Sequence, residues 1–185
     1  MNRFQFSEKD RKEMLSIAHS TMRRYIQKGE YRPDREMKVS KRLTIRTGLF
    51  VSVYVEDELR GCIGTFQEEE PLFIVLQRMT LSAAFHDSRF APVNAMEVEH
   101  AKVELSVLSQ KIPVSSPDEI EIGRHGVYIE KNTNRGTLLP QVAVKNNWSP
   151  NEFVEFCAKY KAGIASNEIP ESSLFVYEAD VFGDL

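Results

Sequence analysis

The amino-acid sequence predicts an α+β fold. Two extended runs, 49–55 and 59–66, are separated by three polar residues and therefore predict a β-hairpin. Three segments with apolar residues at helical spacing, 7–29, 72–85 and 150–163, interrupt the strands without a regular strand–helix alternation. This mixture indicates a mixed, largely antiparallel sheet flanked by about three helices. It excludes an all-helical bundle and a β-sandwich.

The first helix is expected to begin at Ser7 and to end at Gly29. Ser7 is a favourable N-cap, and the acidic Glu8 and Asp10 suit the positive end of the helix dipole. Gly29 can adopt the left-handed conformation that closes many helices. A polar connection over 30–42 then leads to the hairpin.

The second helix is predicted over 72–85, with Pro71 at its first position. Its first turn is apolar on all sides, so we expect it to be deeply buried. The polar segment 86–92 ends the helix and forms a loop. Extended segments follow at 101–108, 120–122, 126–130 and 137–144, although 142–147 would also suit a helix.

The third helix opens with a capping box at 149–152 and closes at Gly163. Four of its residues lie on one face and are expected to join the core: Phe153, Phe156, Cys157 and Tyr160. A final apolar run, 174–182, predicts a strand that ties the end of the chain into the sheet.

Composition limits the class of protein. The chain has 185 residues, of which 42% are hydrophobic and 28% charged, as in one globular domain. Two distant cysteines exclude a disulfide scaffold and an all-cysteine zinc site, and the four histidines show no metal-ligand spacing, so no metal site is expected. We find no signal peptide and no apolar run long enough for a membrane span, and expect a cytoplasmic protein that does not bind membranes.

Positive charge is concentrated in one segment, 23–46. It holds nine basic and three acidic residues, a balance of +6, whereas the whole chain carries −3. One interpretation is a surface that binds nucleic acid. The other is a solvated helix end and loop, which the absence of a nucleic-acid-binding motif favours.

Cys62 is the strongest candidate for chemistry. It lies between Gly61 and Gly64, and glycines in a strand indicate the close approach of a ligand or of another backbone. Arg60 shares its face by strand alternation, and a nearby guanidinium favours the thiolate. The alternative is that Cys62 is a small packing residue in an irregular strand. Cys157, by contrast, is expected to be an unreactive core residue.

Two polar clusters could complete such a site. His86, Asp87 and Arg89 stand where an apolar helix stops, so a histidine base oriented by a carboxylate could serve a thiol. Arg124 and His125 precede a predicted strand and are read either as part of a site or as an ordinary turn.

One octapeptide, Leu59-Arg60-Gly61-Cys62-Ile63-Gly64-Thr65-Phe66, resembles the signature of the AMME chromosomal region gene 1 (AMMECR-type) domain family. Further stretches agree with that family in the same order: 83–90, 104–108, 122–127 and 136–144. The resemblance implies one domain within 1–185, spanning about 7–182, built as a larger and a smaller lobe that could pack intimately. It also implies a groove near the octapeptide.

The resemblance does not supply a reaction, because the activity of the family is unsettled. Its prokaryotic members are encoded with, or fused to, a MEMO-like protein and a radical SAM protein, which implies these partners and a shared modification or redox pathway. The candidate site residues that match family motifs are the catalytic candidates Cys62, His86 and Asp87 and the substrate-binding candidates Arg60, Gly61, Gly64, Arg89, Arg124, His125 and Gln141.

Three hypotheses follow from these observations. The chain is an enzyme or enzyme subunit that uses Cys62, or a non-catalytic module that binds nucleic acid or a protein, or a fold in which the octapeptide is purely architectural. The residues identify no cofactor, substrate or oligomeric state.

Overall fold

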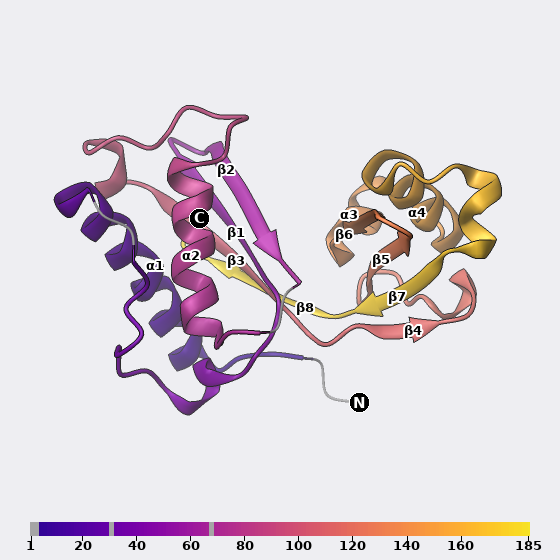
Figure 1. Ribbon diagram of the computed structural model, residues 1–185, viewed down its shortest axis with the longest axis horizontal. Coiled ribbons are helices and arrows are strands. Elements are labelled where there is room, and N and C mark those ends of the chain that lie inside the picture. The colour runs from indigo at the N-terminus through magenta and orange to yellow at the C-terminus, as the bar shows by residue number, and fades with distance from the viewer. Residues whose placement is uncertain (1–3, 30–31, 67–68) are drawn as a thin grey trace. The chain divides into compact units, whose positions relative to one another are not determined.

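The computed structural model describes residues 4–29, 32–66 and 69–185. The chain divides into two compact units, a larger one of Gln5–Leu108 with Asp180–Leu185 and a smaller one of Met1–Phe4 with Ser109–Ala179. Each unit has its own four-stranded sheet with antiparallel pairing (Figure 1). The α+β class predicted from the sequence is confirmed, with the strands divided between two sheets.

In the larger unit the strand order is β2 (Glu58–Thr65), β1 (Leu49–Val55), β3 (Lys102–Leu108), β8 (Ala179–Gly183). Helices α1 (Glu8–Lys28) and α2 (Leu72–Phe85) pack against each other over one face of this sheet (Figure 1). Alternate residues of β1 form the core beneath them and are fully buried, namely Leu49, Val51 and Val53. The intervening Phe50, Ser52 and Tyr54 are half-buried on the opposite face.

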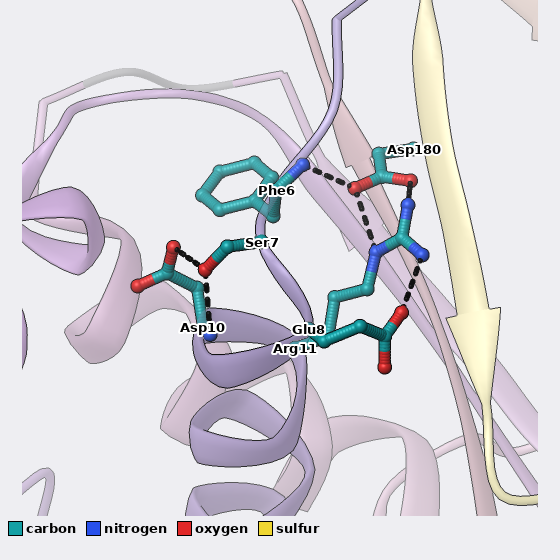
Figure 2. A network of polar contacts seen from close by, with 6 residues as sticks. All are labelled: Phe6, Ser7, Glu8, Asp10, Arg11 and Asp180. Carbon is teal, nitrogen blue, oxygen red and sulfur yellow. Dashed lines mark hydrogen bonds and ion pairs between the residues drawn. The ribbon is translucent and has the colours of Figure 1, made fainter.

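Helix α1 has the caps that its sequence predicts. The Ser7 hydroxyl accepts a hydrogen bond from the Asp10 amide at 3.2 Å, and Gly29 has a left-handed φ of 65°. The helix start is also tied to β8, because the buried Asp180 carboxylate accepts from the Phe6 amide at 2.7 Å and from two guanidinium nitrogens of Arg11 (Figure 2).

The β1–β2 hairpin has a tighter turn than predicted. Only Glu56 and Asp57 connect the strands, and both have the positive φ that two-residue hairpin turns require. The pairing shifts near the turn, with Val53 opposite Gly61 and Tyr54 opposite Leu59, so Arg60 is an extra residue in a β-bulge.

The start of α2 also differs from the prediction by one residue. Pro71 has an extended backbone, with ψ of 144°, and is the N-cap rather than the first helical residue.

In the smaller unit the strand order is β4 (Ile112–Val114), β7 (Ser173–Tyr177), β5 (Gly126–Lys131), β6 (Asn134–Leu138). Helices α3 (Pro140–Asn146) and α4 (Pro150–Phe156) pack against β5, and α4 continues into a π-helical turn, η4 (Cys157–Ala162). Its core includes the fully buried Val127, Ile129, Phe153 and Cys157. Short 3₁₀ helices complete the described chain: η1 (Lys41–Thr44), η2 (Glu97–Glu99), η3 (Pro117–Glu119) and η5 (Ser166–Glu171).

Three predicted strands are corrected. Segment 120–122 leads into a turn at Gly123, whose φ is 85°. Segment 137–144 ends as a strand at Leu138, because Pro140 begins α3. Segment 174–182 is two strands in different sheets, interrupted at Glu178, whose backbone bonds to Ser109 instead of continuing a ladder.

The third predicted helix is confirmed in its caps but not in its buried face. Ser149 and Glu152 form the capping box, and Gly163 closes the helix with φ of 68°. Tyr160 is 61% exposed, whereas Phe153 and Cys157 are fully buried.

Candidate functional site

Strand β2 presents Cys62 on the face of the larger sheet that lies opposite α1 and α2. Cys62 pairs with Ser52 of β1, and Ser52 pairs in turn with Glu104 of β3. The adjacent Gly61 points the other way, since a Cβ there would lie 1.9 Å from the carbonyl oxygen of Ala83 in α2. The Cys62 side chain is therefore half-buried among polar residues rather than in the core.

The main chain of Cys62 is held by an aspartate and an arginine. The Asp87 carboxylate accepts from the Cys62 amide at 2.9 Å, and Arg89 donates to the Cys62 carbonyl at 2.7 Å. The two side chains also bind each other, through Nε at 2.8 Å and Nη2 at 2.7 Å of Arg89. We call Cys62, Asp87 and Arg89 the cysteine clamp.

The electrostatics of the clamp follow from these contacts. Hydrogen bonds from Arg89, and then from backbone amides, hold the pKa of the buried Asp87 far below its ordinary value, although burial opposes this. The pKa of Arg89 is raised, mainly by Asp87 and to a smaller extent by the Cys62 side chain. Arg89 is thus a permanent cation beside Cys62.

Tyr54 is a neighbour of the thiol that the sequence reasoning missed. Its pKa is raised by burial, by Glu104 and by the Cys62 side chain, so the phenol stays protonated and can donate a hydrogen bond. The signal was available in the sequence, because hairpin pairing puts Ser52 and Tyr54 on the same face as Cys62.

His86 has a different neighbour from Asp87 and Arg89. It is the C-cap of α2, is exposed, and stands edge-on to the Tyr25 ring of α1 at a centroid distance of 5.9 Å. The carboxylate beside it in sequence, Asp87, is engaged with Arg89 and the Cys62 amide. The structure therefore brings Asp87 and Arg89 to Cys62, and His86 to Tyr25.

Arg60 is directed to a different carboxylate. Its guanidinium binds Glu97 at 2.5 Å and also donates to the carbonyls of Ala91 and Pro92. The cation that contacts Cys62 is consequently Arg89, whereas alternation along β2 suggested Arg60.

The two glycines of the octapeptide have packing partners. Gly61 admits the backbone of α2, and the Phe50 ring lies over Gly64, where a Cβ would be 2.2 Å from a ring carbon. Both contacts are within the protein, which supports an architectural need for these glycines.

The other candidate residues lie in the smaller unit. Arg124 pairs with Glu178 at 2.7 Å and with Glu121 at 3.0 Å. His125 accepts from the Glu121 amide through Nδ1, and its pKa is lowered, first by burial and then by Arg124. Gln141 is half-buried in the first turn of α3. Arg124 and His125 thus share Glu121 as a partner beside the turn at Gly123.

Comparison with known proteins identifies the family of this chain. A family model described as AMMECR1 matches residues 15–182. The chain belongs to the AMMECR1 family. A protein of Methanopyrus kandleri is 36% identical over 180 residues, covering 91% of this chain and 86% of its own length. A protein of Aquifex aeolicus is 37% identical over 152 residues, covering 78% of this chain and 76% of its own.

A solved structure extends the family likeness to the fold. The crystal structure of an uncharacterised protein from Pyrococcus horikoshii matches with a TM-score of 0.85 at 27% identity, covering 97% of this chain and 94% of that one. All of the cysteine clamp lies within the residues that the AMMECR1 family model matches. None of the helices in the described ranges combines the length and the apolar character needed to cross a membrane.

Within the described residues, four of the nine basic residues in segment 23–46 of this AMMECR1-family chain make internal contacts. Arg23 pairs with Glu99, Arg35 with Glu70, and Arg24 donates to Gln77, while Arg42 lies over the Phe6 ring. Residues 30 and 31 of the segment lie outside the described residues. These pairings reduce the positive charge that the described part of the segment offers to a polyanion.

The low pKa of Asp87 makes the stability of the larger unit depend on pH in the acidic range. In acid, the folded state binds fewer protons at Asp87 than the unfolded chain does. The contribution of the ionised Asp87 to the free energy of unfolding is therefore complete above about pH 4, and it is lost as pH falls toward the folded pKa. Asp87→Asn should cost about 2 kcal/mol at pH 7, because bonds to a charged group are lost. Urea unfolding of both proteins measures this difference.

The difference in the free energy of unfolding between wild type and Asp87→Asn should shrink steadily between pH 4 and pH 2.5. Asp57→Asn is the control, since its partner Lys102 and its own side chain are exposed and the substitution should change little at any pH. A cost of Asp87→Asn that stays constant down to pH 2.5 would show that the charge of Asp87 is not what stabilises the clamp.

Proposed function

We propose that this AMMECR1-family chain is an enzyme or enzyme subunit whose reacting group is the thiol of Cys62. The observation that carries the proposal is the cysteine clamp, in which a buried carboxylate and an exposed guanidinium fix the backbone of a half-buried cysteine. Core cysteines such as Cys157 have no such arrangement, and burial raises the pKa of that thiol to about 12.

Each member of the clamp has a distinct role in this proposal. Cys62 is the nucleophile or redox thiol, and Arg89 favours its thiolate and attracts an anionic group of the substrate. Asp87 is a positioning residue, because it binds Arg89 and the Cys62 amide rather than the thiol. Tyr54 can donate a hydrogen bond to the thiolate or to substrate on the same face.

The remaining predictions from the sequence are parts of this proposal. We keep His86 as general base and Arg60, Arg124, His125 and Gln141 as substrate-binding residues, because these polar residues match family motifs. The cytoplasmic location rests on the sequence, and the MEMO-like and radical SAM partners rest on the family resemblance. The structure supports Arg89 before His86 as the group that activates the thiol, since Arg89 binds the backbone carbonyl of Cys62, whereas His86 packs on Tyr25.

Alkylation of the intact protein by iodoacetamide tests this assignment. Cys157 is fully buried, so peptide mapping of the wild-type protein reports Cys62 without a second substitution. Replacing Arg89 by glutamine should slow alkylation of Cys62 at pH 7 about five-fold, the effect of about 1 kcal/mol at a half-exposed site. Arg89→Lys, which keeps the charge, should recover part of the rate.

Arg60→Gln and His86→Ala are the matched controls. Arg60→Gln should leave the rate unchanged because Arg60 is held by Glu97. A fall in rate with His86→Ala alone would move the role of activating group to the histidine. If Cys62 in the folded wild-type protein is as unreactive as Cys157, the thiol is a packing residue and the proposal is wrong.

Nucleic-acid binding through segment 23–46 receives less support. Several of its arginines already bind carboxylates, an amide or an aromatic ring of the same chain. A gel shift that weakens steeply with salt would restore this alternative, since release of counterions is its signature.

A further inference from the structure

The smaller unit carries a second feature that the cysteine clamp does not use. A row of three aromatic rings, Trp148, Phe156 and Tyr160, runs from the end of α3 to η4. The Trp148 and Phe156 centroids are 4.5 Å apart, and those of Phe156 and Tyr160 are 4.6 Å apart. Trp148 and Phe156 are half-buried, whereas Tyr160 is 61% exposed. Part of a large aromatic surface therefore faces solvent.

The aromatic row lines an open hollow of about 220 Å³ that also has charged walls. Successive rings are tilted by 35° and 40°, so they do not form a flat stack. The hollow is lined by these rings and by Glu152, Glu155 and Lys159. Two carboxylates against one ammonium group give the hollow a net negative charge.

The local backbone is built to place the exposed ring. Tyr160 lies on the π-helical turn η4, a rare conformation that recurs at functional sites. Strand β6 supports this turn through Gly136, where a Cβ would be only 2.6 Å from the backbone nitrogen of Ala162. The capping box of Ser149 and Glu152 fixes the helix that carries Phe156.

The chemistry of this lining selects a cation. Aromatic faces attract positive charge, and carboxylates at the rim add to that attraction while repelling phosphate groups. The protein already shows the preference, because the Lys159 ammonium lies 5.1 Å from the Tyr160 centroid. Lysine is strongly hydrated, so a cation with its charge spread over methyl groups would enter an aromatic hollow at a smaller desolvation cost.

We propose that the hollow formed by Trp148, Phe156, Tyr160, Glu152 and Glu155 binds a methylated ammonium group. The ligand is a small quaternary amine or a methylated lysine side chain, since both present the same head group. The site lies in the smaller unit and is independent of the cysteine clamp.

The chain supplies its own reporter, because Trp148 is its only tryptophan. Titration of the intact protein with choline should change Trp148 fluorescence in a saturable way at constant ionic strength. The matched control is 3,3-dimethylbutan-1-ol, which has the same shape with carbon in place of nitrogen. It should bind at least ten-fold more weakly.

Three variants test the contribution of charge and of the exposed ring. Glu155→Gln and Tyr160→Leu should each weaken choline binding several-fold, and Lys159→Gln should strengthen it by removing the internal competitor. All three positions are exposed, so the variants should fold, which circular dichroism checks. Titration with acetyl-trimethyllysine amide identifies the source of the head group. If this compound binds more tightly than choline, the natural ligand is a methylated lysine side chain, and if it binds more weakly, the natural ligand is a small quaternary amine.

Equal responses to choline and to its neutral isostere would overturn the proposal, because the hollow would then be merely apolar. The absence of saturable binding up to about 50 mM choline would also overturn it, since cation–π attraction at a partly desolvated site predicts at least weak binding.

Discussion

Asp180→Ala is expected to destabilise the larger unit by about 3 kcal/mol. The carboxylate is 4% exposed, and it accepts from the Phe6 amide at 2.7 Å and from Arg11 at 2.6 and 3.2 Å. Its removal leaves the Phe6 amide and the Arg11 guanidinium without these bonds, and breaking a buried pair from one side costs about 3–5 kcal/mol. The lower end applies because the Arg11 side chain is partly exposed.

The same network offers a matched control on its exposed side. Glu8 binds the same guanidinium at 3.1 Å (Figure 2). Its side chain is 76% exposed. Glu8→Gln should therefore cost less than about 0.5 kcal/mol. Urea denaturation followed by circular dichroism compares the variants, and a similar cost for Glu8→Gln and Asp180→Ala would refute the buried ion pair as a major source of stability.

A double-mutant cycle separates the ion pair from the loss of the Phe6 hydrogen bond. Asp180→Asn keeps an acceptor for the Phe6 amide, and Arg11→Met keeps an apolar stem near the Phe182 ring. The two substitutions should show a coupling energy of about 2 kcal/mol, because the side chains are in direct contact. Additive costs would assign the stabilisation to packing and to the amide bond.

Local signals were sufficient to predict the helix boundaries that depend on neighbouring residues. Ser7, Gly29, Ser149 and Gly163 act as caps through contacts within a few residues, so sequence reasoning placed them correctly. The last apolar run was different. Its division at Glu178 depends on hydrogen bonds to Ser109, far away in sequence, and an apolar pattern carries no information about that partner.

The candidate site shows the same limit. Sequence alone singled out Cys62, Asp87 and Arg89, but it paired the thiol with Arg60 by alternation and Asp87 with His86 by adjacency. In the structure Arg60 lies in a β-bulge and its guanidinium pairs with Glu97. The Asp87 carboxylate accepts a hydrogen bond from the Cys62 amide. Each of these outcomes is decided by a tertiary contact that has no local signature.

The aromatic row shows how a rare backbone conformation changes the exposure of a side chain. The spacing of a regular α-helix predicts one shared face for four residues: Phe153, Phe156, Cys157 and Tyr160. The π-helical turn at 157–162 changes the spacing, so Tyr160 reaches solvent while Cys157 stays in the core. A rare backbone conformation of this kind cannot be inferred from periodicity, because periodicity presumes the regular helix.

Gly61→Ala is expected to destabilise the larger unit by about 3 kcal/mol, at the upper end of typical overpacking costs. A Cβ at this position would lie 1.9 Å from the carbonyl oxygen of Ala83 and 2.8 Å from its carbonyl carbon. These are backbone atoms of a buried helix, so no side-chain rotation relieves the clash, and either α2 or β2 must move.

This substitution also distinguishes an architectural octapeptide from one that binds substrate. Glu58→Ala, an exposed change on the same strand, should stay within about 0.5 kcal/mol of wild type in urea denaturation. A large cost for Gly61→Ala means that α2 requires the glycine, whatever binds at Cys62. If the cost is small but alkylation of Cys62 changes, the glycine instead keeps space for a ligand, and the contact with Ala83 is not the reason that glycine occupies this position.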